Sequence, residues 1–324
     1  MDRPTVAIDR GPAATPGRHP DPGAVDVVAD PGALPVRPGA LGGLRLGEAL
    51  GRLRPEDVPM ALAGAHRALA VGGTLELAVA TDGGDGRDAG GDPARPVEGT
   101  RWRPGALADL LVGAGFTVEA LDRVPAGRPA PAGGDGDGPS PASPAPPGPG
   151  RLAARARRAR SLPDTVGPGM RLLVCGLNPS LYAADAGVGF ARPGNRFWPA
   201  ALAAGIVTVD RSPDRALRDH GVGMTDLVKR ATVAAAELTA EEYRAGLARV
   251  ERLVRWLRPG ALCVVGLAGW RAAVDRRARP GVQPEGLGGV PVYLMPSTSG
   301  LNARTPLGEL ADHLRAAARL ADGG

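Results

Sequence analysis

The chain has 324 residues and a formal net charge of +5, and 43% of its residues are hydrophobic while only 3% are aromatic. This length accommodates two domains of ordinary size, and the scarcity of aromatic side chains excludes a broad stacking platform for single-stranded nucleic acid. The positive charge favours an anionic partner. Every Lys or Arg residue except Lys229 is arginine, however, so a compositional bias toward Ala, Gly, Pro and Arg explains the charge equally well.

Cysteine and histidine usage argues against a disulfide and against a metal site. The two cysteines, Cys175 and Cys263, each lie in an apolar run, where cysteine behaves as a small buried hydrophobe. The four histidines show no metal-ligand spacing, so we expect no metal and no other cofactor. No apolar run reaches the roughly 18 residues of a membrane span, and the N-terminus has no signal-peptide core. We therefore expect a cytoplasmic protein with no membrane partner.

Strand and helix patterns alternate over residues 24–124, after a segment, residues 1–23, that we expect to be disordered. The alternation is typical of an α/β domain. A Gly- and Asp-rich stretch at 82–96 interrupts it and lacks the closing Glu of an EF-hand calcium loop, so we expect a disordered surface loop there. The patterns predict strands at 25–30, 74–81 and 117–124 and helices at 57–69 and 106–116.

The order of VDVVADPGALPV, HRALAVGGTLELAV and LVGAGFTVEAL resembles the second half of a class I S-adenosylmethionine-dependent methyltransferase. In that family a glycine-rich turn after the first strand holds the cofactor, and the residues before VDVVAD contain no such strand, turn and helix. The resemblance therefore implies a truncated, inactive, Rossmann-like module. Methyltransferase activity is the weakest of the functions that we consider.

Residues 125–150 contain nine Pro and seven Gly, a composition that cannot form a packed element, and we predict a linker between two domains. The next ten residues, RLAARARRAR, contain five arginines. They open a predicted Arg-rich segment, residues 151–167. Two interpretations remain open, a solvated helix and an arm that attracts DNA phosphates.

From Met170 the sequence MRLLVCGLNPS predicts a buried strand that runs into a turn. The carboxyl end of a strand is where open α/β sheets bind ligands, so Asn178 is expected at the mouth of a site. Asn-Pro is also an ordinary turn dipeptide, so this motif alone does not decide between a structural and a functional role.

Three motifs together are more informative: GLNPSLYAADAGVGFARPGNRFWPAALAAGI, GVGMTDLVKRATVAAAEL and MPSTSGLNAR. In this order they resemble the mismatch-specific uracil-DNA and thymine-DNA glycosylases of the uracil-DNA glycosylase superfamily, over about residues 168–321. The resemblance implies a glycosylase-like domain at 168–324 and double-stranded DNA with G·U or G·T mismatches as the partner. It also implies a three-layer α/β/α fold with a central, mainly parallel sheet, and we expect a monomer.

In the first motif the resemblance implies that Asn178 positions the water that attacks the sugar. The surrounding turn, formed by Gly176, Leu177, Pro179 and Ser180, would hold the departing base through backbone amides. Phe190 would stack on the flipped base, whereas Phe197 and Trp198 are expected in the core. Ala183 leaves room for a 5-methyl group, and Asn195 suits a helix N-cap as well as a catalytic role.

The third motif contains the expected wedge loop, residues 297–304. A base must leave the helix before it is attacked, and an apolar side chain such as Leu301 can fill the space it vacates. The implied DNA contacts of this loop are Ser297, Ser299, Gly300, Leu301, Asn302 and Arg304. In the second motif Lys229 and Arg230 are candidate phosphate contacts or exposed side chains.

The sequence thus predicts a monofunctional, metal-independent DNA glycosylase that hydrolyses the N-glycosidic bond of uracil or thymine opposite guanine and initiates base excision repair. The alternative is a non-catalytic binder of mismatches or lesions, in which Ser180, present where the family has Gly, has changed the turn. The sequence also predicts strands at 171–175, 261–265 and 291–294 and helices at 195–205, 239–257 and 306–321.

Overall fold

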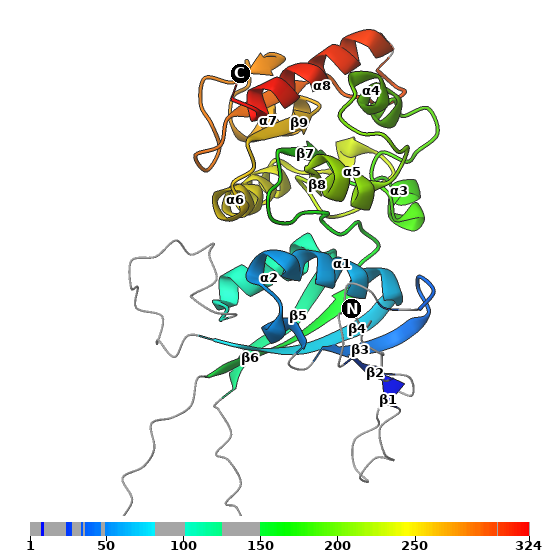
Figure 1. Cartoon of the computed structure of the whole chain (residues 1–324), viewed down its shortest axis with the longest axis vertical. Helices are drawn as coiled ribbons and strands as arrows, with labels where there is room; N and C mark the ends of the chain where they lie inside the picture. Colours follow the sequence, from blue (N-terminus) through cyan, green and yellow to red (C-terminus); the bar gives the residue numbers. More distant parts are fainter. Residues whose placement is uncertain are drawn as a thin grey trace, which may run out of the picture.

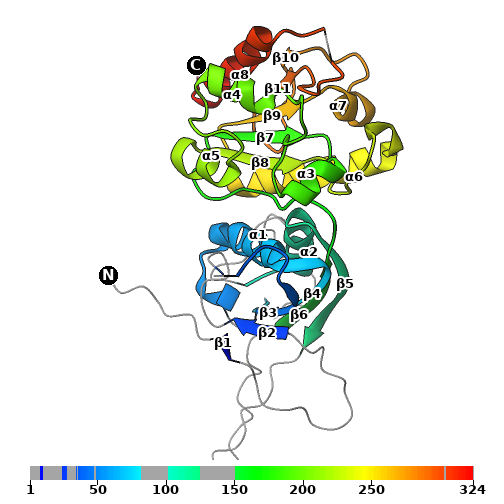
Figure 2. The same cartoon turned by 90° about the vertical axis from the view of Figure 1, so that its right-hand side faces the viewer.

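The computed structural model describes residues 8–9, 24–27, 34, 36–46, 49–81, 101–124, 150–302 and 304–323. It contains a six-stranded and a five-stranded sheet, each covered by helices, stacked along the long axis of the molecule (Figures 1 and 2). The predicted loop at 82–96 lies outside the described residues. Most of the predicted disordered segment 1–23 also lies outside them, but Ile8–Asp9 forms a short strand, contrary to that prediction.

The first sheet has the spatial order β1-β2-β3-β4-β6-β5. The pairs β2–β3 and β3–β4 are parallel, whereas β1 runs antiparallel to β2, and β6 runs antiparallel to both β4 and β5. Helices α1 and α2 lie on the face of this sheet that is turned toward the second domain (Figure 1). The elements are β1 (Ile8–Asp9), β2 (Ala24–Val27), β3 (Leu41–Leu46), η2 (Ala49–Arg52), η3 (Pro55–Asp57), α1 (Val58–Ala68), β4 (Leu69–Ala80), α2 (Pro104–Gly113), β5 (Phe116–Val124) and β6 (Arg151–Arg158).

This Rossmann-like α/β arrangement was predicted from the sequence, and both helices and the strands around 25, 74 and 117 are confirmed. Strand β3 was missed because its sequence, LGGLRL, contains two glycines, which are depleted in strands. The Pro- and Gly-rich segment was predicted to separate two domains, and this prediction is wrong. Its flanks, β5 and β6, are antiparallel neighbours in one sheet, with Val124 opposite Arg151.

The Arg-rich segment is a strand over residues 151–158, neither a helix nor an arm, and this corrects both earlier interpretations. Its arginines alternate with small residues, and Leu152, Ala154 and Ala156 are buried, which is the period of a half-buried strand. On the exposed face, Arg155 and Arg157 pair with carboxylates of neighbouring strands, Glu76 on β4 and Glu119 on β5. Two of the five arginines are therefore paired with carboxylates within the sheet.

The second sheet has the order β10-β11-β9-β7-β8 and is parallel except for the edge strand β10. Helices α4, α5 and α8 cover one face and α6 and α7 the other, which confirms the predicted three-layer α/β/α architecture. The predicted strands and helices correspond to β7 (Leu172–Gly176), β9 (Ala261–Val265), β11 (Val292–Met295), α4 (Phe197–Ala204), α6 (Ala240–Leu257) and α8 (Leu307–Ala321). The remaining elements are α3 (Leu181–Ala186), α5 (Pro213–His220), β8 (Val222–Asp226), η4 (Ala235–Glu237), α7 (Ala268–Ala273) and β10 (Gly281–Val282).

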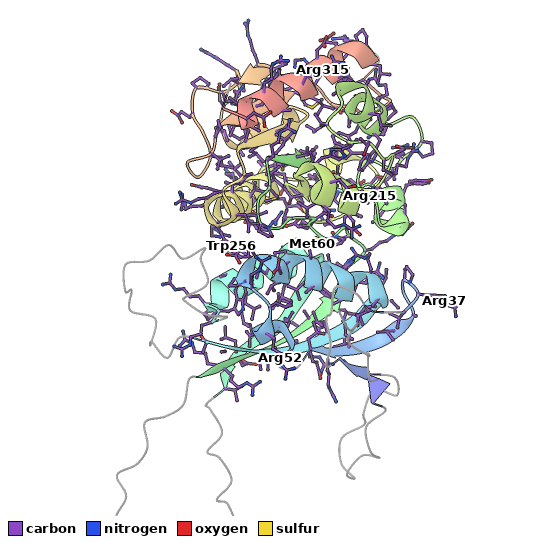
Figure 3. The ribbon with its side chains drawn as sticks, viewed as in Figure 1. Arg37, Arg52, Met60, Arg215, Trp256 and Arg315 are labelled. Atoms are coloured by element: carbon purple, nitrogen blue, oxygen red, sulfur yellow. The ribbon has the colours of Figure 1, made fainter. Side chains whose placement is uncertain are left out.

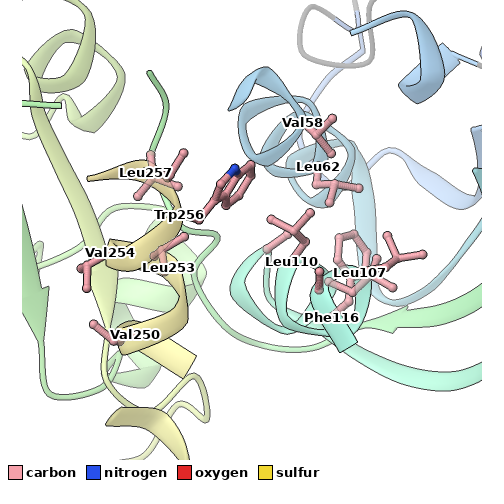
Figure 4. Packing of buried hydrophobic residues seen from close by; sticks show 14 of the residues in the cluster. Val58, Leu62, Leu107, Leu110, Phe116, Val250, Leu253, Val254, Trp256 and Leu257 are labelled. Atoms are coloured by element: carbon pink, nitrogen blue, oxygen red, sulfur yellow. The ribbon is translucent and has the colours of Figure 1, made fainter. Parts of the chain in front are cut away.

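The two domains share a continuous apolar core. Trp256 of α6 points toward α1 and α2 (Figures 3 and 4) and meets Trp102 edge to face, with ring centroids 6.0 Å apart. Arg252 of α6 and Asp109 of α2 form an ion pair at the border of this contact, with an Nη2–Oδ1 distance of 2.9 Å. The described helices include none long and apolar enough to cross a membrane.

A buried polar network reinforces the junction. Asp164 accepts hydrogen bonds from Lys229 Nζ, Arg249 Nη1 and Thr225 Oγ1, each at 2.7 Å, and its backbone N–H donates to the carbonyl of Gly113 in α2 at 2.8 Å. Burial disfavours the charged form of Asp164, but Arg249 and Lys229 outweigh this effect and keep its pKa below the usual range. The carboxylate therefore stays ionised at the domain boundary.

Candidate active site

A pocket of 270 Å³ opens beyond the carboxyl end of β7, the position at which parallel sheets bind ligands. It is lined by the turn after β7, the Phe190 loop and the wedge loop, which are far apart in the sequence. Ten of the predicted site residues line it: Leu177, Asn178, Pro179, Ser180, Ala183, Phe190, Asn195, Ser297, Ser299 and Leu301. The other predicted site residues, Gly176, Lys229, Arg230, Gly300, Asn302 and Arg304, lie outside this lining set.

The side-chain amide of Asn178 is fixed by three hydrogen bonds. Its Nδ2 donates to Thr232 Oγ1 at 2.8 Å, to the carbonyl of Arg230 at 3.0 Å and to the carbonyl of Pro179 at 3.2 Å. Because the nitrogen is used in this way, the carbonyl oxygen Oδ1 is left as the group of Asn178 that can accept a hydrogen bond. No donor among the described residues bonds to Oδ1. Thr232 was not singled out from the sequence, although it lies in the second motif.

The turn that carries Asn178 is held by backbone hydrogen bonds to the segment after β8. The N–H groups of Leu227, Val228 and Thr232 donate to the carbonyls of Gly176, Leu177 and Pro179, at 2.9, 2.9 and 3.2 Å.

Ser180 has φ −73° and ψ 158°, an extended conformation that any residue adopts, and its Oγ accepts from Ala183 N–H at 3.2 Å. It is therefore the N-cap of α3. The replacement of Gly by Ser does not strain the turn. Ala183, on the first turn of α3, is buried and contributes only a methyl group to the pocket wall.

Phe190 lies in the left-handed region with φ 58°, a conformation that costs a bulky residue about 1–3 kcal/mol. Two contacts hold it there. Its ring stacks on Phe197, with centroids 4.2 Å apart and an interplanar angle of 20°, and Trp198 Nε1 donates to the carbonyl of the preceding Gly189 at 2.8 Å. Phe197 and Trp198 are buried, as predicted, and they position the aromatic ring at the pocket.

Asn195 and Arg196 organise the loops around the pocket. Asn195 Oδ1 accepts from Phe197 N–H at 2.9 Å, at the first residue of α4, although Arg196 and not Asn195 occupies the N-cap position. The Arg196 backbone N–H donates to the carbonyl of Thr298 at 2.9 Å. Its guanidinium bridges two further carbonyls, with Nη2 bonded to Asn302 in the wedge loop and Nη1 to Thr305, the residue after this loop, at 2.5 Å. Arg196 was not singled out from the sequence.

Leu301 projects from the wedge loop with 89% of its surface exposed. A side chain at Gly300 would put its Cβ 2.9 Å from the carbonyl oxygen of Gly194, so the loop needs glycine there to pack against its neighbour. Asn302 was predicted to meet the orphaned guanine or a phosphate, but its Nδ2 donates within the loop, to Ser297 O at 2.7 Å and Thr305 Oγ1 at 3.2 Å. Arg304 is exposed at the same surface.

The predicted phosphate contacts Lys229 and Arg230 each form an ion pair within the protein. Only 9% of the Lys229 side chain is exposed because the ammonium is buried against Asp164, so this prediction is wrong for Lys229. Arg230 is exposed, but its guanidinium pairs with Glu242, with a shortest N–O distance of 2.7 Å. The contact of Arg230 with the site is made by its backbone carbonyl, which accepts a hydrogen bond from Asn178.

Asp226 is a site residue that sequence reasoning missed. It is the last residue of β8, the strand beside β7, and it lines the pocket together with Asn178 and Phe190. A carboxylate at the carboxyl end of a buried parallel strand was the available signal. Elsewhere, no group of three or more His, Cys, Asp or Glu side chains in the described part of the chain is placed to hold a metal ion.

Comparison with known families agrees with this geometry. Residues 163–320 match the family described as the uracil DNA glycosylase superfamily. This part of the chain is a uracil DNA glycosylase superfamily domain. The match covers β7 to α8 and so includes every residue that lines the pocket except Leu162. Within the superfamily, the mismatch-specific branch remains a prediction from the sequence.

The solved structures similar to the chain include methyltransferases, the family that residues 24–124 resemble. One is a methyltransferase dependent on S-adenosylmethionine from Methanosarcina mazei, with 10% identity, coverage of 40% of this chain and 64% of that chain, and a TM-score of 0.29. Another is 1,6-didemethyltoxoflavin-N1-methyltransferase from Burkholderia thailandensis, with 21% identity, 38% and 45% coverage and a TM-score of 0.26. The chain spans less than two thirds of the length of either structure, and we draw no conclusion about activity from a likeness of this extent.

Proposed function

We propose that the uracil DNA glycosylase superfamily domain is a monofunctional, cofactor-independent DNA glycosylase that removes uracil or thymine opposite guanine. The observation that carries the proposal is the single pocket that joins Asn178, Phe190 and Leu301. An immobilised amide, a strained aromatic residue and an exposed leucine have no common structural purpose. Together they supply the three operations that excision of a stacked base requires.

The first operation is extrusion of the base. Leu301 would enter the duplex and occupy the space that the flipped nucleotide leaves. Arg196 would hold the wedge loop in place while the duplex is distorted, because its guanidinium bonds to the carbonyls of Asn302 and Thr305 at the end of that loop. Arg304, which is exposed, would contact a phosphate or the orphaned guanine.

The second operation is to hold the extruded base. One face of Phe190 is covered by Phe197, so the base would stack on the other. Ala183 on the pocket wall presents only a methyl group, which leaves room for the 5-methyl of thymine. Uracil, which is smaller, would also fit, and we therefore propose that both bases are accepted.

The third operation is hydrolysis. Asn178 Oδ1 would accept a hydrogen bond from a water molecule and direct its oxygen to C1′ of the sugar, while the bond to the base breaks and the base leaves with the bonding electrons. Asn cannot take up the proton of this water as a carboxylate could. Positioning and electrostatic stabilisation must therefore supply most of the rate enhancement, and we expect slow turnover.

The test is base release from duplexes that differ only in the central pair, G·U, G·T, A·U and G·C, followed by strand cleavage at the abasic site. We expect release from G·U and G·T. Asn178→Ala should lower the single-turnover rate about 100-fold or more while DNA binding and thermal unfolding stay close to those of the parent. Equal rates for the variant and the parent would contradict the assigned role of Asn178.

The same experiment addresses the alternative of a non-catalytic mismatch binder. That alternative depended on a turn altered by Ser180, and Ser180 fits the turn without strain. Tight binding to G·U duplexes without any base release would nevertheless favour it. The full chain should be used, because a chain that starts at residue 151 would leave β6 without β4 and β5.

A further inference from the structure

The carboxyl group of Asp226 lies next to the ring that the proposed function assigns to the base. A Cβ placed on Gly176 would be 2.5 Å from Asp226 Oδ1 and 3.3 Å from Phe190 Cζ. The carboxyl group and the edge of the ring therefore meet above the same glycine. Asp226 also borders a second cavity of 340 Å³ that adjoins the first, and the two share Leu162, Gly189 and Phe190.

Unlike Asp164, the side chain of Asp226 has no hydrogen-bond donor among the described residues. Lys229 and Arg249 both direct their charged groups to Asp164, and Arg249 Nη2 reaches only the backbone carbonyl of Asp226, at 2.8 Å. Asp226 is half-buried and lines the pocket, so its unpaired carboxyl group is open to a ligand there. The pocket is the direction from which a partner for this carboxyl group can come.

The surroundings of Asp226 favour its neutral form. Burial raises its pKa to about 6; Lys229 and Arg249 oppose this rise and Asp164 adds to it. The other charged side chains on elements around the adjoining cavity are Arg67, Arg158, Asp185, Arg211 and Asp214. Arg192 is the other charged side chain that lines the first pocket, and none of the described histidines lines either cavity, so Asp226 is the carboxyl group there whose pKa burial raises.

We propose that Asp226 faces the flipped base and that its protonation controls the release of that base. This inference rests on the proposed glycosylase function. The neutral carboxyl group donates its O–H to a carbonyl oxygen of the pyrimidine and stabilises the negative charge that develops there as the glycosidic bond breaks. The ionised carboxylate has no proton to donate and repels the same charge. The proton stays on Asp226 throughout, and the departing base takes its own proton from solvent.

The decisive variant is Asp226→Asn, which keeps the shape of the side chain, carries no charge and offers an N–H donor at every pH. Release of uracil from a G·U duplex would be measured under single-turnover conditions with saturating enzyme between about pH 5.5 and 8.5, a window that brackets the pKa of Asp226. For the parent we expect the rate to fall by up to about tenfold per pH unit above the pKa. The variant should show a flat profile and exceed the parent at least about tenfold at the alkaline end.

Asp185→Asn is the matched control. It removes the same charge from the rim of the adjoining cavity, where Asp185 is exposed and paired with Arg160, and it should leave the parent profile unchanged. A variant at Asp226 that is slower than the parent at every pH, or that keeps the parent slope, would overturn the inference. So would a flat profile of the parent itself, which needs no variant to fold. Absence of base release by the parent on every duplex would instead refute the proposed function.

Discussion

Replacement of Leu301 by alanine distinguishes between two roles of this side chain, a wedge that enters DNA and a residue of the folded core. Because 89% of the side chain is exposed, only about a tenth of the 1.5–3 kcal/mol available from full burial of a leucine contributes to folding, roughly 0.2–0.3 kcal/mol. Leu301→Ala should therefore leave thermal unfolding within about 1 °C of the parent. Insertion between base steps would bury most of the remaining surface and stabilise the flipped complex by about 1.5–2.5 kcal/mol, equivalent to roughly 10–70-fold in rate.

The assay compares single-turnover uracil release from a G·U duplex with release from the same strand alone. Leu301→Ala should slow the reaction on the duplex by this factor and have little effect on the single strand, which has no stack to invade. Val282→Ala, on β10 and 59% exposed, is the control for loss of an exposed apolar side chain and should change neither rate. Equal losses on both substrates, or a large drop in thermal stability, would refute the wedge role.

Three further predictions concern the residues that support the site. Arg196→Lys should reduce activity on the duplex about fivefold with little change on the single strand, because an ammonium cannot bridge the two carbonyls that hold the loop of Leu301. Asp164→Ala should lower the free energy of unfolding in urea by about 3–5 kcal/mol, because it leaves the buried Arg249 and Lys229 uncompensated. Burial, and then Arg158, lower the pKa of His66 to about 3. The unfolded state binds a proton near the ordinary pKa of 6.5, so the contribution of neutral His66 to the free energy of unfolding is complete above pH 6.5 and is lost as the pH falls. Relative to the parent, His66→Leu should gain about 2 kcal/mol in unfolding free energy between pH 7 and 5.

Each of these predictions has a contradicting result. Arg315→Lys removes an exposed guanidinium that also bonds to a carbonyl, of Ala203, and is the control for Arg196→Lys. Equal effects of the two changes on duplex activity would remove the special role of Arg196. An unfolding free energy for Asp164→Ala within 1 kcal/mol of the parent would show that the network contributes little, and a constant difference between His66→Leu and the parent from pH 7 to 5 would exclude His66 as the acid-sensitive group.

Local patterns in the sequence were sufficient to predict most helices and strands of both domains. In the second domain the predicted strands and helices were found because each carries its own period: buried apolar runs for β7, β9 and β11, and amphipathic spacing for α6 and α8. The pocket residues came together for a simple reason. Parallel strands end at the same edge of a sheet, so the turn at Asn178 and the loop at Leu301 must be neighbours.

The errors arose where the partner of a residue is distant in the sequence. The Arg-rich stretch forms strand β6, which pairs with β4 and β5. Its outward-facing arginines bind Glu76 and Glu119, and these partners are known only from the tertiary structure. Its alternation of arginine with small residues was present in the sequence. The repeated charge concealed it, because a run of arginines is equally compatible with a solvated helix.

The sequence by itself determined the α/β class, the order of the three motifs and the presence of an exposed leucine after a buried strand. Only the tertiary structure decided which charges are available to a partner. Lys229 is neutralised by Asp164, which lies 65 residues away, whereas Asp226, three residues before Lys229, is left without a donor. The interaction of a charge depends on distance and on exclusion of water, and both are set by packing between segments that local periodicity does not connect.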